Sequence, residues 1–209
     1  IALAGASGNV VKGNYIGTDA TGMVDVGNGQ NGLFILRAPD NIIGQSSGTS
    51  FVRNLISGNT RDGIRIEGAE ATGNVVAGNR IGTDATGAGR IRNDMNGVYI
   101  LNAASNIVGG AFSEPPNHPN FLGNTIAGNS GDGVKIEGAT ASGNFVGANL
   151  IGTTHTGLKP QANIGNGIHI LNAPDNRIGA AKAGDAALTG NTISANLNGI
   201  KIAGATATG

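Results

Sequence analysis

The chain has 209 residues with 13 basic and 13 acidic side chains, so its formal net charge is zero. This balance argues against nucleic acid and anionic membrane surfaces as partners, because both attract an excess of cationic groups. With 39% hydrophobic and 12% charged residues the chain is not of the intrinsically disordered class, and without cysteine it has neither a disulfide framework nor a thiolate metal site.

The composition also disfavours helices. Gly accounts for 38 residues and Asn is abundant, and both residue types are poor helix formers. No apolar run approaches the roughly 20 residues of a membrane span, so we expect no membrane insertion. No signal peptide is visible and the first residue is not Met, so we expect an excerpt or a mature subunit of a longer array.

An internal repeat organises the whole chain. Units of roughly 33 residues follow one another, each beginning at an Asn. They start at Asn9, Asn41, Asn74, Asn106, Asn144 and Asn176, after a shortened first unit. Because each unit is too small to bury an apolar face alone, we interpret residues 1–209 as one domain of stacked units.

Each unit contains three very short apolar segments. In the first unit these are residues 9–11, 14–16 and 31–36, and in the second they are 41–43, 54–56 and 63–66. Their period-two alternation predicts strands, and the Gly, Asn and Asp residues between them predict tight corners. We therefore predict an all-β fold, a right-handed single-stranded parallel β-helix of about six three-stranded coils.

The alternation assigns branched aliphatic side chains to three interior columns. The first column is Val11, Ile43, Val76, Val108, Val146 and Ile178, and the second is Ile16, Ile56, Ile81, Ile126, Ile151 and Ile193. The third is Leu33/Ile35, Ile64/Ile66, Val98/Ile100, Val134/Ile136, Ile168/Ile170 and Ile200/Ile202. The Asn that starts each unit is expected to form an amide ladder along the rod, since an unpaired buried amide is costly.

The outward side chains of the third column form a candidate ligand-binding row. After Ala2 they are Phe34, Arg65, Tyr99, Lys135, His169 and Lys201. Aromatic and cationic side chains in one row could bind an extended sugar or an acidic polymer. Cross-strand packing on a solvated sheet explains the same pattern.

A second outward stripe, beside the first column, is mainly apolar. It consists of Val10, Ile42, Val75, Ile107, Phe145 and Arg177. Such a stripe is expected to be covered, either by a loop of the same chain or by a neighbouring rod.

Long loops are predicted at two corners. They span residues 18–30, 83–95 and 153–165 in the odd units and 45–52, 111–122 and 180–189 in the even units. In stacked folds, insertions of this kind often mark the binding edge.

A longer pattern carries a family resemblance. Gly-Asn-x-Ile-Gly-Thr-Asp-Ala-Thr-Gly occurs at 13–22 and 78–87, joined to Asn-x-Ile-Ser-Gly-Asn and Gly-Ile-x-Ile-x-Gly. It resembles the right-handed parallel β-helix repeats of the pectate-lyase-like superfamily, in particular the tandem repeats of large bacterial surface and secreted proteins. The resemblance implies this fold and an extracellular or cell-surface location. It selects no activity, because the superfamily includes enzymes, adhesins and repeats of no known activity.

No catalytic set can be assembled from the sequence. Glu67 and Glu137 are candidates for acid/base sugar chemistry, but Leu101 lies between them in the stack, two coils apart. We therefore predict local ion pairs with Arg65 and Lys135. The resembling lyases use clustered acidic residues with a nearby Arg or Lys, and no such cluster matches here.

Metal and cofactor sites are weakly indicated. Asp19 and Asp84 in the Thr-Asp-Ala-Thr-Gly loops could bind calcium, although an Asp-containing turn explains them as well. His118, His155 and His169 lack metal-ligand spacing and are expected to be ordinary surface residues. No cofactor is expected.

Two functions from different classes remain. The first is a non-enzymatic extracellular structural or adhesive rod, whose copies could associate head to tail or laterally into filaments. The second is a carbohydrate-binding or polysaccharide-degrading module, lyase-like or epimerase-like, that uses the row from Phe34 to Lys201.

Overall fold

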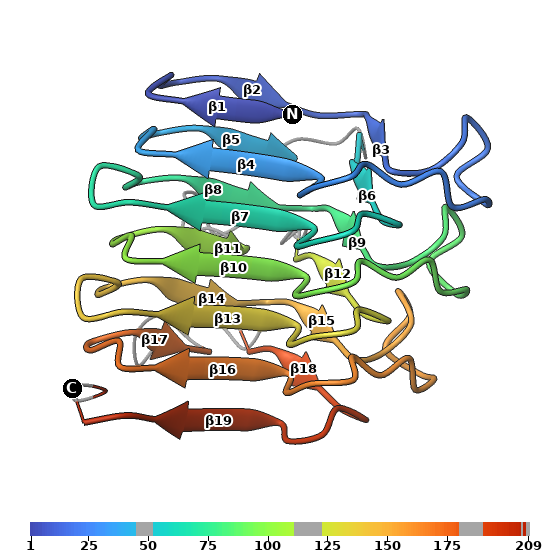
Figure 1. Ribbon diagram of the computed structural model, residues 1–209. Coiled ribbons are helices and arrows are strands. Elements are labelled where there is room, and N and C mark those ends of the chain that lie inside the picture. Colours follow the sequence, from blue (N-terminus) through green and yellow to red (C-terminus); the bar gives the residue numbers. More distant parts are fainter. Residues whose placement is uncertain (45–51, 111–122, 180–189, 206, 208–209) are drawn as a thin grey trace, which may run out of the picture.

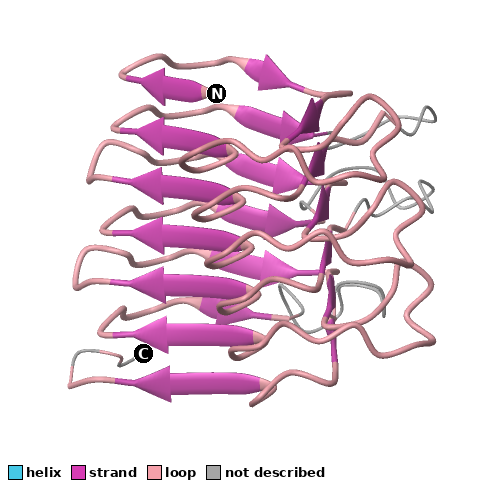
Figure 2. Cartoon of the chain, turned by 45° about the vertical axis from the view of Figure 1, so that its right-hand side comes forward, coloured by secondary structure: helices cyan, strands magenta, loops and turns pink. Residues whose placement is uncertain are grey.

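Three parallel β-sheets stack short strands into a rod (Figures 1 and 2). The computed structural model describes residues 1–44, 52–110, 123–179, 190–205 and 207. Within these ranges every regular element is a strand, and each strand pairs in parallel with the equivalent strand of the next coil. The prediction of an all-β solenoid is confirmed.

The sheets differ in strand count as expected from the shortened first unit. Sheet A has seven strands: β1 (Ala2–Ala4), β4 (Leu33–Leu36), β7 (Ile64–Glu67), β10 (Val98–Leu101), β13 (Val134–Glu137), β16 (Ile168–Leu171) and β19 (Ile200–Ala203). Sheet B has six: β2 (Val10–Val11), β5 (Ile42–Gly44), β8 (Val75–Ala77), β11 (Ile107–Gly109), β14 (Phe145–Gly147) and β17 (Arg177–Ile178). Sheet C has six: β3 (Tyr15–Ile16), β6 (Leu55–Ile56), β9 (Arg80–Ile81), β12 (Thr125–Ile126), β15 (Leu150–Ile151) and β18 (Thr192–Ile193). Sheets B and C each stack six strands and so contain five steps; the rod makes about five turns, slightly fewer than the six coils predicted.

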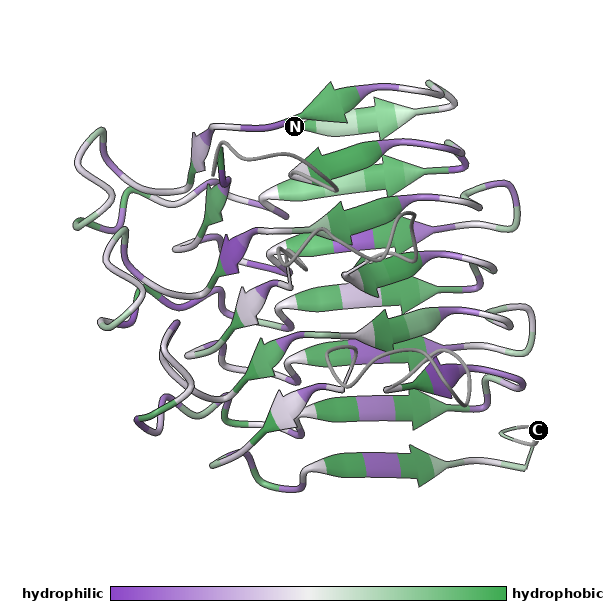
Figure 3. Cartoon of the chain, turned by 180° about the vertical axis from the view of Figure 1, so that it is seen from behind, coloured by the Kyte–Doolittle hydropathy of each residue, from purple (hydrophilic) through white to green (hydrophobic). Residues whose placement is uncertain are grey.

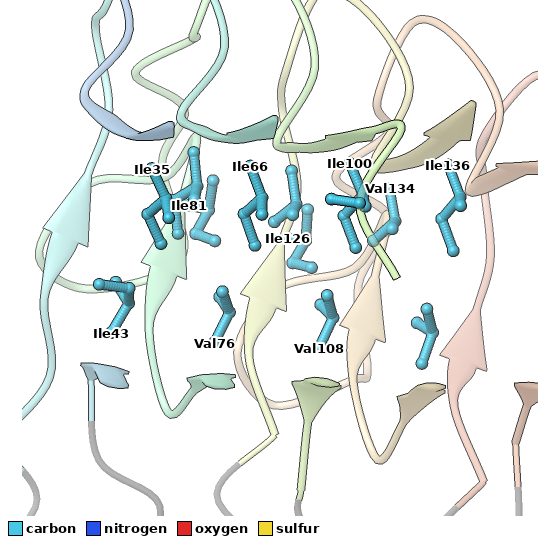
Figure 4. Packing of buried hydrophobic residues seen from close by; sticks show 14 of the residues in the cluster. Ile35, Ile43, Ile66, Val76, Ile81, Ile100, Val108, Ile126, Val134 and Ile136 are labelled. Atoms are coloured by element: carbon cyan, nitrogen blue, oxygen red, sulfur yellow. The ribbon is translucent and has the colours of Figure 1, made fainter. Parts of the chain in front are cut away.

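The three interior columns lie where the alternation placed them (Figure 4). Ile64, Val98, Val134 and Ile168 are partners in register and are fully buried. Members of the columns in the outermost coils are less covered, for example Ile202 at 62% exposed. Branched aliphatic side chains suit this narrow interior, because stacked identical positions leave little room for other shapes.

The outward stripe of sheet B is partly buried, and most completely at Phe145. Figure 3 views the rod from behind and shows hydrophobic residues along these strands. Val10 is 56% exposed, Ile42, Val75 and Ile107 are half-buried, and Phe145 is only 5% exposed. The loops predicted for the even units lie outside the described residues, except for Val52.

The odd-unit loops fold back over sheet C. An isolated antiparallel bridge closes each loop, joining Thr18 to Asp25, Thr83 to Arg90 and Thr153 to Pro160. A side chain at Gly22 would meet Leu55 of sheet C at 2.7 Å, so this glycine permits a close approach that buries Leu55. These loops therefore form a second layer over sheet C, visible at the right of Figure 2.

Successive odd-unit loops contact one another although they belong to alternate coils. The Ala85 N–H donates to the Gly22 carbonyl at 2.9 Å, and the His155 N–H donates to the Gly87 carbonyl at 3.1 Å. Each loop consists of two segments joined by the antiparallel bridge. Along the rod axis such a loop occupies two strand spacings, about 10 Å, which equals the height of two coils. Loops on every second coil are thus sufficient to build a continuous layer.

Candidate binding face

The strands of sheet A stack over one another (Figure 1), and their register brings all six predicted row residues to one outward face. The register pairs Phe34 with Arg65, Arg65 with Tyr99 and Tyr99 with Lys135. It then pairs Lys135 with His169 and His169 with Lys201. We call these six side chains the sheet A row. A parallel sheet in register forms such rows of necessity, because equivalent residues lie one strand spacing apart.

The face of sheet A alternates in chemistry from coil to coil. Each strand directs two side chains to this side. In odd coils they are an aromatic residue and a leucine, as Phe34/Leu36, Tyr99/Leu101 and His169/Leu171. In the even coils they are a cation and, in two of three strands, a glutamate, as Arg65/Glu67, Lys135/Glu137 and Lys201/Ala203. The face therefore repeats every two coils.

The glutamates of the face form local ion pairs, as predicted. Arg65 Nε lies 2.7 Å from Glu67 Oε2, and Lys135 Nζ lies 2.7 Å from Glu137 Oε2. Both pairs join residues two apart on one strand, which share a face. These carboxylates are thus engaged within their own strands.

Tyr99 occupies the centre of the row and is almost covered. The Arg65 guanidinium lies 4.7 Å from its ring centroid on one side, and Lys135 Nζ lies 5.1 Å from it on the other. Its hydroxyl donates a 2.6 Å hydrogen bond to Glu137 Oε2, and the residue is only 9% exposed. Both ring faces are therefore occupied by neighbouring cations, and a sugar ring has no free face of Tyr99 to stack on.

These contacts shift two protonation equilibria. Burial, followed by the hydrogen bond to Glu137, raises the pKa of Tyr99 well above its ordinary value. Hydrogen bonds from Lys135 and from Tyr99 lower the pKa of Glu137. At neutral pH the trio is therefore a phenol donating to a carboxylate that also pairs with an ammonium group.

His169 differs from its prediction. It was expected to be an ordinary surface residue, but its side chain is only 12% exposed and its Nδ1–H donates to Asp132 Oδ2 at 3.0 Å. Neighbouring coils cover a side chain of this row from both sides, which the sequence position alone does not show. His155 is exposed as predicted, and His118 lies outside the described residues.

Asp132 belongs to a polar ladder next to sheet A that the sequence reading missed. Its members alternate in part between Asn and Asp: Asn31, Asp62, Asn96, Asp132, Asn166 and Asn198. Asn96 donates from its backbone N–H and from Nδ2 to Asp62 Oδ1, at 3.0 and 2.8 Å. Asn166 donates in the same way to Asp132 Oδ1, both at 2.7 Å.

Each of the two ladder carboxylates has a partner side chain in the row. A carboxylate cannot donate a hydrogen bond, so its second oxygen needs a positive or donating group. Asp62 Oδ2 lies 3.5 Å from Arg65 Nη1, and Asp132 Oδ2 accepts from His169. The row and the buried ladder are therefore one connected network.

Three further ladders consist of asparagine alone. The predicted ladder through Asn9, Asn41, Asn74, Asn106, Asn144 and Asn176 is present, with Nδ2–H to Oδ1 distances of 2.9 to 3.2 Å. Two more run through Asn14, Asn54, Asn79, Asn124, Asn149 and Asn191, and through Asn28, Asn59, Asn93, Asn129, Asn163 and Asn196. An Asn recurs at these corners in every coil, and this recurrence could have predicted the two additional ladders.

The aspartates of the odd-unit loops close turns, as one of the two interpretations expected. The Thr21 hydroxyl and the Val24 N–H donate to the Asp19 carboxylate and lower its pKa to about 2. Burial alone would raise the pKa of Asp84, but hydrogen bonds from Thr86 and from the Gly89 N–H lower it. Both carboxylates thus accept hydrogen bonds from their own loops.

Within the described ranges, no three or more His, Asp or Glu side chains lie together in a way that could hold a metal ion. The described segments include no apolar helix of membrane-crossing length. No protein-family model, no curated protein and no solved structure matches this chain.

Proposed function

We propose that this chain is a non-enzymatic structural rod with an extracellular or cell-surface role. The observation that carries the proposal is that the carboxylates on and beside the sheet A face are paired with neighbouring side chains. Glu137 accepts from Lys135 and Tyr99, Glu67 pairs with Arg65, and Asp132 accepts from His169. Acid/base catalysis needs a group free to exchange a proton with a bound substrate, and these groups are held by fixed neighbours.

These contacts within the fold also suit a mechanical or adhesive role. Buried amide ladders tie each coil to the next, and the Tyr99 ring between two cations links three coils, so the surface is presented in a fixed arrangement. The extracellular location in the proposal is supported by the resemblance of the repeats to those of bacterial surface and secreted proteins.

Self-association into filaments is part of the proposal. Parallel pairing between equivalent strands joins every coil to the next, and the same pairing could join one copy to another. Negative-stain electron microscopy of the purified chain over a concentration series tests this part. Fibres one rod wide are expected, and short particles of uniform length at every concentration would contradict it.

A polysaccharide panel tests the absence of catalysis. Incubation with neutral and acidic polysaccharides, followed by ultraviolet detection of unsaturated products and by a reducing-end assay, is expected to show no product. Turnover that is abolished by Lys135→Ala but kept by Lys159→Ala, an exposed lysine of an odd-unit loop, would overturn the proposal. That result would favour the lyase-like alternative.

A second candidate function, binding of carbohydrate, is favoured by the exposed end of the row. Phe34 is half-buried and lines a shallow hollow together with Ala2, Arg61, Arg65 and Glu67. The row neighbour of Phe34 on one side is Ala2, whose small side chain leaves that ring face open. An aromatic face beside two arginines is suited to a sugar ring that carries an acidic group.

Two matched variants distinguish carbohydrate binding from a purely structural role. If the hollow binds sugar, Phe34→Ala weakens retention on an acidic-polysaccharide affinity gel, whereas Tyr99→Phe leaves it unchanged because the Tyr99 ring is already covered. Equal retention of both variants and the unaltered chain would exclude the hollow as the binding site.

A further inference from the structure

Asn-Gly sequences are the places where a protein chain deamidates most readily. The glycine nitrogen can attack the preceding Asn side chain without steric hindrance, because glycine has no Cβ. This chain contains five such pairs: Asn28-Gly29, Asn31-Gly32, Asn96-Gly97, Asn166-Gly167 and Asn198-Gly199. Their surroundings in the fold are not equivalent.

Three of the pairs are protected by the sheet. The Gly32 N–H donates to the Asp62 carbonyl at 3.0 Å, the Gly97 N–H to the Asp132 carbonyl at 2.9 Å, and the Gly167 N–H to the Asn198 carbonyl at 2.8 Å. Each nitrogen is therefore held in an inter-coil hydrogen bond and cannot turn toward the side chain before it. Attack at these sites requires local opening of the sheet.

Asn28-Gly29 lacks this protection. Both residues are exposed, and within the described chain the Gly29 N–H has no hydrogen-bond acceptor. A side chain at Gly29 would meet nothing within 4 Å, so no neighbouring atoms crowd this glycine. The fifth pair, Asn198-Gly199, lies in the outermost described coil and lacks the neighbouring coil that the three protected pairs have.

We propose that Asn28 is a site of spontaneous deamidation in the folded protein. The Gly29 nitrogen attacks Asn28 Cγ and loses its proton, the Cγ–Nδ2 bond breaks, and ammonia leaves. The resulting succinimide is opened by water at either carbonyl, giving aspartate or isoaspartate. Water is the only co-reactant, and no oxidation or reduction takes place.

The modification changes the contact between the first odd-unit loop and the next coil. Asn28 Nδ2 donates to Asn59 Oδ1 at 2.8 Å, and a carboxylate at this position cannot donate. The Asn28 carbonyl accepts from the Thr60 N–H at 3.1 Å and from the Thr60 hydroxyl at 2.6 Å. Isoaspartate lengthens the main chain by one carbon and displaces this carbonyl, so the Thr60 N–H loses its partner.

Peptide mapping by mass spectrometry of the full chain, aged in mildly alkaline buffer, tests the proposal. Aspartate and isoaspartate are expected to accumulate at Asn28, with the reaction at Asn31, Asn96 and Asn166 slower by at least about a hundredfold because those sites must open first. The Thr60 amide should exchange with deuterium faster in the aged protein. Similar rates at Asn28 and Asn96 in the folded chain would overturn the proposal.

Two controls separate the fold from the local sequence. In the urea-unfolded chain the five pairs should react at similar rates, and an unfolded chain that reacts mainly at Asn28 would contradict a role for the fold. Gly29→Ala has space for its methyl group and keeps the backbone conformation, so it should fold and slow the reaction at Asn28 several-fold. Undiminished modification in Gly29→Ala would show that the Gly29 nitrogen is not the attacking group.

Discussion

The Tyr99 hydroxyl donates a 2.6 Å hydrogen bond to Glu137, on the neighbouring strand of sheet A. Since Glu137 also pairs with Lys135, the bond links an odd coil to the even coil beside it. Tyr99→Phe removes the donor and keeps the ring between its two cations. We expect a loss of about 1–2 kcal/mol in the free energy of unfolding, measured by urea denaturation.

A double-mutant cycle with Glu137→Ala, which removes the acceptor, assigns that loss to the bond. The two single variants and the double variant should give a coupling free energy of about 1 kcal/mol. A coupling near zero would mean that Tyr99 and Glu137 stabilise the rod independently.

Tyr99 should resist ionisation while the protein is folded. Its pKa is raised by burial and by the bond to Glu137, so the folded state holds the phenol proton above about pH 10, where an unfolded tyrosine releases it. The stabilisation is full below that pH and is lost as pH rises toward the raised pKa. Ultraviolet titration of the chain minus that of Tyr99→Phe isolates this residue, and a phenolate signal with an ordinary midpoint would refute the burial.

Glu137 should make the stability of the fold depend on pH in the acidic range. Its pKa is lowered by Lys135 and then by Tyr99, so its stabilisation is present above the unfolded value of about 4.3 and is lost as pH falls through the lowered folded pKa. The melting temperature, measured between neutral and strongly acid pH, should therefore fall less steeply with acid in Glu137→Gln than in the unaltered chain. Parallel declines would indicate that other carboxylates dominate.

Buried ladder amides should be costly to remove. Asn124 Nδ2 donates to Asn149 Oδ1 at 2.9 Å and to the Val76 carbonyl at 2.8 Å, while its Oδ1 accepts from Asn79. Asn124→Ala leaves the partner groups on Asn149, Val76 and Asn79 without this side chain inside the rod. We expect a loss of about 3 kcal/mol in the free energy of unfolding. Asn14→Ala, in an exposed position of the same ladder, should cost under about 1 kcal/mol. Equal losses would show that burial does not determine the cost.

Much of this architecture could be predicted from the sequence because every coil repeats the same short-range pattern. Alternation in segments such as Ile64–Glu67 predicts which side chains point inward, and the fixed period stacks them, so the columns and the register of the row follow. The ion pairs of Glu67 and Glu137 were predictable for the same reason, since each partner is two residues away on one strand.

The contacts that were missed depend on side chains or loops from different coils. The burial of Tyr99 arises from cations on both neighbouring strands, and the Asp132–His169 pair joins residues of different coils. The contact of Ala85 with Gly22 depends on the height of a folded loop, which the composition of residues 18–30 does not reveal. Such contacts need the three-dimensional stack before they can be recognised.

Hydrogen exchange of asparagine side-chain amides, followed by NMR, tests the central claim most directly. If equivalent coils lie in register and the ladders are continuous, the Nδ2 protons of Asn74, Asn79 and Asn129 should exchange as slowly as the backbone amides of sheet A. Exchange of these protons at the rate of a freely solvated asparagine would contradict the buried ladders and the stacked arrangement built on them.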